Sequence, residues 1–199
     1  AGSYEVSLVV TSSFGCISDT FRMNVAVTPP PTASFTQSGQ LCEGSVINFV
    51  SNSQGNNITS YQWFVNGTPS SVTNAQFDFT PGSAGSYDIR LLVTTSGGCT
   101  DDTTITINTN AKPLASFATP VICLPAGTAP FTNQTSISDG TTTQLTYLWE
   151  FGDGNTSTDE NPVHIYSGTG PYNVKLTATS VNGCADDTTI VLSTIYDQP

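Results

Sequence analysis

Apolar and polar side chains alternate along several stretches of this sequence, and the alternation predicts β-strands. From Tyr87 to Val93, and again from Tyr172 to Ala178, every second side chain is apolar, and polar positions such as Asp88 and Lys175 lie between. Successive side chains of a strand point to opposite faces, so each stretch has one face suited to a core. The sequence has no helical period of useful length, which favours an all-β fold.

Further strands are expected from the same pattern, between clusters of turn-forming residues. They lie at residues 46–50, 61–65, 75–79 and 103–108, with counterparts at 129–132, 145–151, 163–166 and 188–192. About seven short strands in roughly 85 residues are typical of a sandwich of two antiparallel sheets. Trp63 and Trp149 fall on its third strand, where such sandwiches keep a core aromatic residue. Tyr87 and Tyr172 open the sixth strand behind a glycine, as a tyrosine corner does.

One phrase recurs three times, which indicates tandem repeats. Each copy has a strand that opens near Tyr4, Tyr87 or Tyr172, at intervals of 83 and 85 residues. Each strand is followed by a Gly-Cys pair and then by acidic residues and threonine, and the pairs are Gly15-Cys16, Gly98-Cys99 and Gly183-Cys184.

A second phrase, Ala-Ser-Phe shortly after a proline, begins at Pro31 and again at Pro113, and Pro199 stands where a third copy would begin. We therefore expect the C-terminal part of one repeat at residues 1–29, a diverged repeat at 30–112 and a complete repeat at 113–199. The chain is then expected to be a stretch of a longer array.

The third repeat closely resembles the PKD (polycystic kidney disease) domain. The resemblance rests on three motifs, which are Trp149-Glu150-Phe151-Gly152-Asp153-Gly154, Asn161-Pro162-Val163-His164-Ile165-Tyr166 and Gly170-Pro171-Tyr172-Asn173-Val174. With their flanks they cover most of residues 113–199. The second repeat departs from the family, because Trp63-Phe64-Val65-Asn66-Gly67 replaces the Gly-Asp-Gly turn. The resemblance implies tandem immunoglobulin-like, PKD-type β-sandwiches in an end-to-end array.

The resemblance also suggests where such arrays occur. Repeats with a Gly-Cys-x-Asp ending look like those of giant gliding-motility surface adhesins of Bacteroidota, which the type IX route secretes. PKD domains also occur as spacers in secreted enzymes that degrade chitin, collagen or other polymers.

Composition excludes several classes of partner. The chain has 4 Lys and Arg against 15 Asp and Glu, so the basic surface that nucleic acid or an anionic membrane requires is missing. No apolar run approaches the roughly 18 residues of a membrane-spanning helix, so this segment is not expected to insert into a membrane. Polarity comes instead from 23 Ser and 32 Thr, which suit half-exposed strands.

Five cysteines provide the main candidate chemistry: Cys16, Cys42, Cys99, Cys123 and Cys184. The sequence has no Cys-x-x-Cys motif, and a single histidine cannot complete a zinc site, so disulfides outside the cytosol are expected. Three arrangements remain open. They are a bond between repeats, Cys42–Cys184; bonds within each repeat, Cys42–Cys99 and Cys123–Cys184; and free thiols.

Sandwich topology favours the bond between repeats. Cys42 lies at the first turn of its repeat and Cys99 at the last turn, and these turns are at opposite ends of an immunoglobulin-like sandwich. An eight-residue strand between them spans roughly 25 Å, whereas a disulfide requires Cα atoms within about 7 Å. If repeats stack end to end, Cys42 meets Cys184, and Cys16, Cys99 and Cys123 pair with repeats outside this chain.

Acidic pairs at turns are the candidates for a cation. Asp101, Asp102, Asp186 and Asp187 could contribute to a weak calcium site, although their spacing matches no known calcium loop. The alternative is that these carboxylates accept hydrogen bonds at turns and strand starts. No other cofactor is expected.

The remaining polar motifs are interpreted as structural. Gly152, Asp153 and Gly154 form a hairpin turn in which Asp153 caps neighbouring amides. His164, the single histidine, is expected to be a structural strand residue. Thr103 and Thr188, which follow acidic pairs, are candidates for O-glycosylation. No nucleophile–base pair is recognised, so the chain is not expected to be an enzyme.

Two functions follow from the sequence. The first is a segment of a long extracellular repeat adhesin or filament, a stiff stalk for cell-surface adhesion or gliding. Its partners would be neighbouring repeats, surface polysaccharide or other cell-surface proteins. The alternative is a spacer or carbohydrate-binding module of a secreted polysaccharide- or protein-degrading enzyme. A binding module would require an exposed aromatic platform, for which Tyr61, Phe64 and Tyr147 are the candidates.

Overall fold

Strands dominate the computed structural model, which describes residues 2–193 and 195–196. In that part of the chain the only helical element is a short 3₁₀ turn, η1 (Thr142–Gln144). Among the described residues, no helix has the length and apolar character that are needed to cross a bilayer. Pro199, where the repeat spacing would begin another copy, lies outside the described residues.

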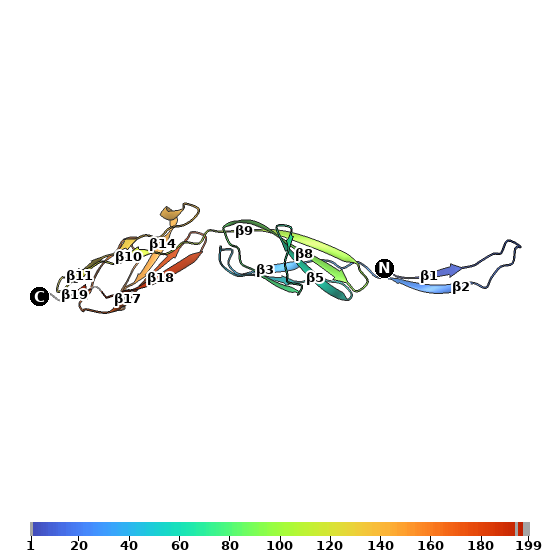
Figure 1. Cartoon of the computed structure of the whole chain (residues 1–199), viewed down its shortest axis with the longest axis horizontal. Helices are drawn as coiled ribbons and strands as arrows, with labels where there is room; N and C mark the ends of the chain where they lie inside the picture. Colours follow the sequence, from blue (N-terminus) through green and yellow to red (C-terminus); the bar gives the residue numbers. More distant parts are fainter. Residues whose placement is uncertain (1, 194, 197–199) are drawn as a thin grey trace. The chain divides into compact units, whose positions relative to one another are not determined.

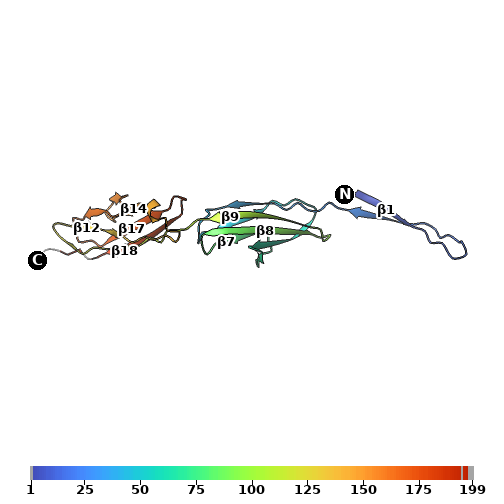
Figure 2. The same cartoon turned by 90° about the horizontal axis from the view of Figure 1, so that it is seen from above.

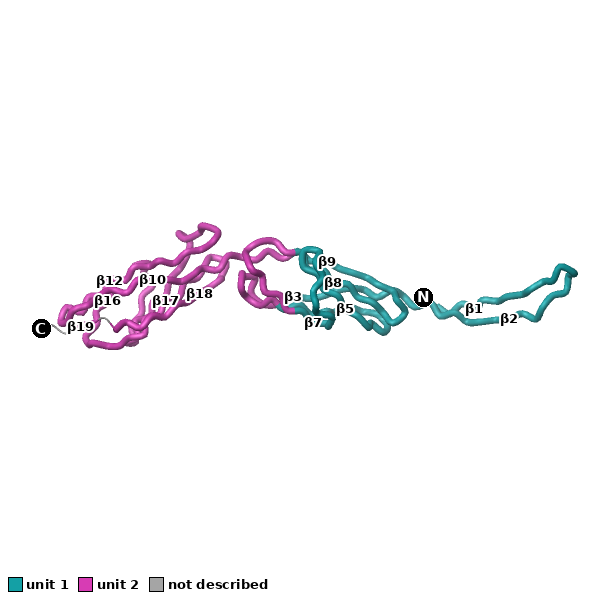
Figure 3. The backbone as a smooth tube through the Cα atoms, in the orientation of Figure 1, with its two compact units in different colours: residues 1–37, 48–77, 88–106 teal, residues 38–47, 78–87, 107–199 magenta. Residues whose placement is uncertain are grey.

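The chain divides into two compact units, which Figure 3 colours separately. One unit contains residues 1–37, 48–77 and 88–106, and the other contains residues 38–47, 78–87 and 107–199. This division does not follow the repeat boundaries expected near residues 30 and 113. One end of the second repeat, including residues 38–47 and 78–87, shares a unit with the whole third repeat.

The third repeat contains a four-stranded sheet with the order β15-β14-β17-β18. Its strands are β14 (Thr146–Glu150), β15 (Thr156–Ser157), β17 (Tyr172–Thr179) and β18 (Ala185–Leu192). Strands β17 and β18 run side by side in Figures 1 and 2, paired antiparallel from Tyr172↔Leu192 to Thr179↔Ala185.

Short strand pairs complete the third repeat. The antiparallel pairs are β10 (Phe117–Ala118) with β13 (Thr132–Asn133), and β12 (Thr128–Pro130) with β16 (Val163–Ile165). Strand β11 (Ile122–Cys123) pairs in parallel with β19 (Ile195–Tyr196). The parallel pair brings the first turn of this repeat to its last described residues.

The core of the third repeat is centred on Trp149. Its ring lies 5.0 Å from that of Phe117 and 5.5 Å from that of Phe131, between centroids, and its side chain is fully buried. The indole Nε1–H donates to the Asp159 carbonyl oxygen at 3.0 Å. A large apolar ring with a satisfied donor suits a sandwich interior, because the buried polar atom then costs little.

The second repeat has a four-stranded sheet in the order β6-β5-β8-β9 and a three-stranded sheet in the order β3-β4-β7. The first comprises β5 (Ile58–Val65), β6 (Thr68–Pro69), β8 (Gly85–Thr95) and β9 (Thr100–Thr109). The second comprises β3 (Phe35–Ser38), β4 (Ile47–Ser51) and β7 (Gln76–Phe79). Trp63 contacts aromatic rings of the smaller sheet and donates to the Asn74 carbonyl at 2.9 Å, much as Trp149 does in the third repeat.

Residues 1–29 contribute a hairpin of β1 (Gly2–Leu8) and β2 (Phe21–Val27). Its register places Tyr4 opposite Val25 and Val6 opposite Met23, so one face is apolar. These four side chains are exposed. The hairpin corresponds in sequence to β17 and β18, whose matching face contributes Val174 and Leu176 to the core of the third repeat.

The strands expected from alternation are present, with ends that differ by one to three residues in most cases. The largest difference concerns residues 129–132, where one expected strand is two, β12 and β13, separated at Phe131. The split lets one segment pair with two different partners, β16 and β10. Strands β2 and β3 were also not expected. The short strands β6, β10, β11, β15 and β19 were missed because two residues carry no measurable alternation.

Candidate functional site: a disulfide-linked joint

A disulfide joins Cys42 of the second repeat to Cys184 of the third. The Cα atoms are 5.7 Å apart, and 142 residues of sequence separate the two cysteines. Both side chains are buried. The structure therefore contains the pairing favoured by the stacking argument. The same-repeat pairs Cys42–Cys99 and Cys123–Cys184 are absent from it, since Cys99 and Cys123 are free.

Local backbone structure presents each cysteine to the other. Cys184 lies in the turn between β17 and β18, where the Ser180 N–H donates to the Cys184 carbonyl at 2.8 Å and Gly183 has a φ of 80°. Glycine is suited to this turn because a side chain at positive φ is strained. Cys42 forms a parallel bridge with Asn110, and the Glu43 N–H donates to the Asn110 carbonyl at 3.0 Å.

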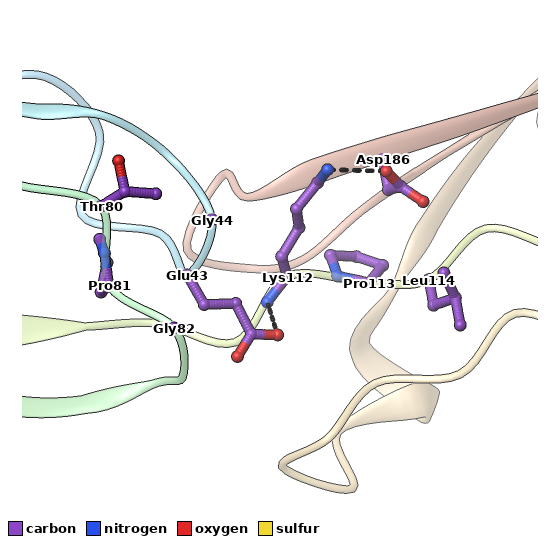
Figure 4. A pocket seen from close by; sticks show the side chains of 9 residues that line it. All are labelled: Glu43, Gly44, Thr80, Pro81, Gly82, Lys112, Pro113, Leu114 and Asp186. Carbon is purple, nitrogen blue, oxygen red and sulfur yellow. Dashed lines mark hydrogen bonds and ion pairs between the residues drawn. The ribbon is translucent and has the colours of Figure 1, made fainter.

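Close in sequence to the two bonded cysteines, the carboxylates of Glu43 and Asp186 bind the segment between the repeats, and Figure 4 shows both of them with Lys112. Glu43 accepts hydrogen bonds from the backbone N–H of Ala84 at 3.0 Å and of Lys112 at 3.1 Å. The Lys112 Nζ lies 2.7 Å from Asp186 Oδ1, and Asp186 Oδ2 accepts from the Ala115 N–H at 3.0 Å. The carboxylates of Glu43 and Asp186 thus bind the main chain and the Lys112 side chain of the connecting segment, residues 110–115, between the two repeats.

The protonation of Asp186 reflects these contacts. Burial alone would raise the pKa of its carboxyl, but the hydrogen bond and charge of Lys112 and the amide of Ala115 outweigh burial and lower it. A carboxylate that accepts such bonds is stabilised in its charged form. The joint therefore depends on Asp186 being ionised.

Apolar side chains pack on another side of the connecting segment. Ala111 is buried in a cluster with Ile137 and Leu145 of the third repeat, and Ala84 and Tyr147 pack against this cluster. Ala84 belongs to the turn whose N–H contacts Glu43, so polar and apolar contacts hold the same turn. The joint combines a covalent bond, an ion pair, backbone hydrogen bonds and a small apolar core.

An open cleft of about 390 Å³ lies over this joint, between Glu43 and Asp186 (Figure 4). Its remaining lining comes from residues 44, 80–82 and 112–114. The carboxylate oxygens of Glu43 and Asp186 are already occupied by amides and by Lys112. We therefore interpret the cleft as the outer surface of a structural joint.

The acidic pairs do not come together as a calcium site. Within the described residues no group of three or more His, Cys, Asp or Glu side chains is placed to hold a metal ion. Successive residues of a strand face opposite sides, which separates each pair. Asp101 accepts from the Ala33 N–H at 2.7 Å, and Asp102 lies 3.0 Å from Arg90. Asp187 lies 3.5 Å from Lys175.

The Gly-Asp-Gly hairpin forms a second polar cluster. Asp153 accepts from the Asn155 N–H at 3.0 Å, and its other oxygen lies 2.7 Å from Nε2 of His164. Burial would raise the pKa of Asp153, but the bonds from His164 and Asn155 outweigh it and lower the pKa. The His164 ring stacks on Phe151 with centroids 4.1 Å apart. This cluster pins the hairpin to strand β16.

The tyrosines that open the sixth strands differ in their contacts. Tyr87 donates from its hydroxyl to the Ser83 carbonyl at 2.9 Å, as a tyrosine corner does. Tyr172 instead stacks on Tyr166, whose hydroxyl donates to the Phe151 carbonyl at 3.0 Å, and burial raises the pKa of that Tyr166 phenol.

The candidate glycosylation sites lie in strands of the large sheets. Thr103 is in β9 and Thr188 is in β18, and both are half-buried. Modification of either residue remains a prediction.

Sequence reasoning missed Glu43 and Lys112, the two residues that complete the joint. A signal was present, because Glu43 directly follows a cysteine and Lys112 is one of only 4 basic residues and lies in a connecting segment. That signal becomes informative only in the folded structure, where Glu43 accepts from the amides of Ala84 and Lys112, which lie 41 and 69 residues away in the sequence.

Comparisons with known proteins identify the third repeat. The PKD domain family matches residues 110–195. Collagenase ColA of Bacillus cereus is 48% identical over 50 residues, which are 23% of this chain and 5% of that protein. The pre-pro-metalloprotease PrtV of Vibrio cholerae is 44% identical over 54 residues, which are 27% of this chain and 6% of that protein. The chain thus spans only a small part of either relative.

The fold has a counterpart that covers nearly the whole chain. The N-terminal eight Ig domains of Down Syndrome Cell Adhesion Molecule (DSCAM) align with a TM-score of 0.55 at 12% identity, over 98% of this chain and 27% of that one. This likeness concerns the immunoglobulin-like fold alone. Domains of the PKD and immunoglobulin-like types are generally not catalytic. Residues 110–195 therefore match the PKD domain family, in a chain built from immunoglobulin-like sandwiches.

Proposed function

We propose that this chain is a non-catalytic spacer of a secreted enzyme that degrades a protein or polysaccharide polymer. The observation that carries the proposal is the match of short stretches of this chain to a collagenase and to a pre-pro-metalloprotease. These relatives favour the enzyme spacer over the adhesin stalk, which the repeat pattern first suggested.

The joint supports a role in holding domains apart. A spacer has to limit the freedom of the segment between its domains, since a flexible linker lets them approach each other. Here Glu43 and Asp186 bind the connecting segment, and the Cys42–Cys184 bond links the repeats covalently. None of these contacts requires a ligand.

A spacer fits the aromatic side chains better than a carbohydrate-binding module does. Tyr61, Phe64 and Tyr147, the candidates for a sugar-stacking platform, are all half-buried. The Phe64 ring is covered by the guanidinium of Arg90, 4.5 Å from its centroid, and Tyr147 packs against the apolar cluster of the joint. Sugar rings stack on open aromatic faces, which Phe64 and Tyr147 do not offer.

An extracellular location agrees with the same chemistry. Disulfides persist in oxidising compartments and are rare in the cytosol. Collagen, the substrate named for one relative, is an extracellular polymer. We therefore propose that the protein is secreted.

The test is the domain content of the full-length protein, followed by a deletion. We expect a hydrolase domain in the same polypeptide. Removal of residues 113–199 should leave turnover of a small soluble substrate unchanged and reduce turnover of the insoluble polymer. A long array of repeats that ends in a secretion-sorting domain, without a hydrolase, would contradict the enzyme spacer.

That contrary outcome would support the second candidate, a stalk of a cell-surface adhesin. The observation in its favour is the tandem repetition at intervals of 83 and 85 residues together with a disulfide between repeats. Such a stalk would bear load and would have neighbouring repeats as its main partners. Surface polysaccharide or other cell-surface proteins would be contacted elsewhere on the filament.

A further inference from the structure

The turn that carries Cys184 occurs three times in this chain with the same backbone geometry. The glycine before each cysteine has a φ of 82°, 80° and 80°, at Gly15, Gly98 and Gly183. In each turn the N–H four residues earlier donates to the cysteine carbonyl, at 2.8, 2.9 and 2.8 Å, from Ser12, Thr95 and Ser180. Cys184 is the only one of the three cysteines that is bonded. The Gly-Cys turn is therefore a standard part of each repeat.

The first turn of the repeat, which carries the other half of the disulfide, is also duplicated. Cys42 pairs in parallel with Asn110, and the next N–H donates to the Asn110 carbonyl at 3.0 Å. Cys123 pairs in parallel with Tyr196, and the next N–H donates to the Tyr196 carbonyl at 2.9 Å. A proline follows three residues after Asn110 and three residues after Tyr196. The Cys123 turn thus reproduces the backbone arrangement of the Cys42 turn.

The two first turns differ in what covers them. Cys42 is 3% exposed because the Cys184 turn lies against it, whereas Cys123 is exposed. Two large apolar side chains beside Cys123 are exposed as well, Val121 at 70% and Tyr196 at 56%. Exposed apolar side chains around an exposed free thiol are a liability unless a partner covers them.

We propose that the Cys123 turn, with Val121 and Tyr196, is a docking surface for the Gly-Cys turn of another repeat of this kind. The occupant is specified by the joint already formed in this chain, where the equivalent first turn holds the equivalent Gly-Cys turn. The inference goes beyond the proposed function, since the joint would serve a spacer and a stalk equally.

Docking places two thiols together for oxidation. Cys123 and the incoming cysteine each lose one proton and one electron as the S–S bond forms. A disulfide oxidant, either a thiol oxidoreductase or glutathione disulfide, accepts the two electrons and two protons and leaves as two thiols. The outcome is a second joint of the Cys42–Cys184 type.

The experiment extends the full chain after Pro199 with a second copy of residues 114–199, so that Pro199 takes the place of Pro113. The protein is reduced and then oxidised in a glutathione buffer, free thiols are alkylated, and peptides are mapped without reduction. We expect a cross-linked peptide between Cys123 and Cys184 of the added copy, beside the original Cys42–Cys184 peptide. Alkylated Cys123 in the original third repeat of a protein with the Cys42–Cys184 bond intact would overturn the proposal, as would a bond from that Cys123 to a cysteine of its own repeat.

Matched variants separate docking from chance oxidation. Cys99→Ser, in the equivalent turn of the second repeat, should leave the new cross-link in place. Cys123→Ser should leave Cys184 of the added copy alkylated.

A second readout does not depend on bond formation. In the reduced protein, docking of the added turn should slow the reaction of Cys123 with a thiol reagent several-fold relative to the unextended chain. Equal rates in a folded extended chain would refute the docking surface.

Discussion

The Cys42–Cys184 disulfide should remove most of this chain from the path of a pulling force. A force applied at the two ends passes along the chain to Cys42, crosses the S–S bond and continues from Cys184. The residues between the two cysteines cannot be drawn out while the bond is intact, even if their sandwiches unfold. The perturbation is loss of the bond, by reduction or by the double substitution Cys42→Ser with Cys184→Ser.

The magnitude follows from the length of the closed loop. The cysteines are separated by 142 residues, and an extended chain reaches about 3.3–3.6 Å per residue, so breaking the bond should release roughly 470 to 510 Å. Only the segments outside the loop contribute to extension in the oxidised protein.

Single-molecule force spectroscopy with handles at the two termini measures this quantity directly. We expect the fully unfolded length of the oxidised protein to be shorter than that of the reduced protein by the amount above. The double-serine variant should give the longer value under both conditions, and Cys99→Ser, which removes a free thiol, should behave as the unsubstituted chain. Equal unfolded lengths for oxidised and reduced protein would refute the force-shielding argument.

Three further predictions concern stability. Loss of Cys42–Cys184 should lower the free energy of unfolding by about 2–5 kcal/mol in denaturant titration, because a closed loop of this length restricts the unfolded chain; an unchanged midpoint contradicts this. Gly152→Ala should lower the free energy of unfolding of the third repeat by about 1–3 kcal/mol, because φ is 83° and a Cβ would lie 2.7 Å from the backbone of β17. The control Gly154→Ala has open space around it and should cost less in the same titration. Because folding lowers the pKa of Asp186 from 3.8, its contribution to the free energy of unfolding should be full above pH 3.8 and should be lost as pH falls through the lowered pKa. In a pH series of melting temperatures, Asp186→Asn should flatten this acidic part of the curve.

Much of the fold was predictable because it follows from local pattern. Alternation around Ile89 and Val174 indicated the central strands, since a two-residue period exposes one face and buries the other. Trp63 and Trp149 indicated the core for a different reason, because a ring of that size has few places to pack outside an interior. The short strands escaped prediction because pairing with a distant partner, and not the sequence of two residues, defines them.

The disulfide was partly predictable, and its surroundings were not. Strand length and the bonding distance of sulfur were enough to favour Cys42–Cys184, since both are general quantities. The contacts of Glu43 with amides of Ala84 and Lys112 had no such basis. They depend on which turns the folded chain brings beside that carboxylate.

By itself, the sequence determined that this protein is an all-β chain of tandem repeats with cysteines at two fixed places in each repeat, because period, spacing and residue type are local properties. Tertiary structure decided how the polar side chains are used. It separated the acidic pairs onto opposite strand faces and turned Asp186 toward Lys112, so that a candidate calcium ligand became part of the joint. It also added a contact to His164 to the cap that Asp153 makes in its hairpin. Such choices require distances between residues far apart in the chain, which only the folded molecule supplies.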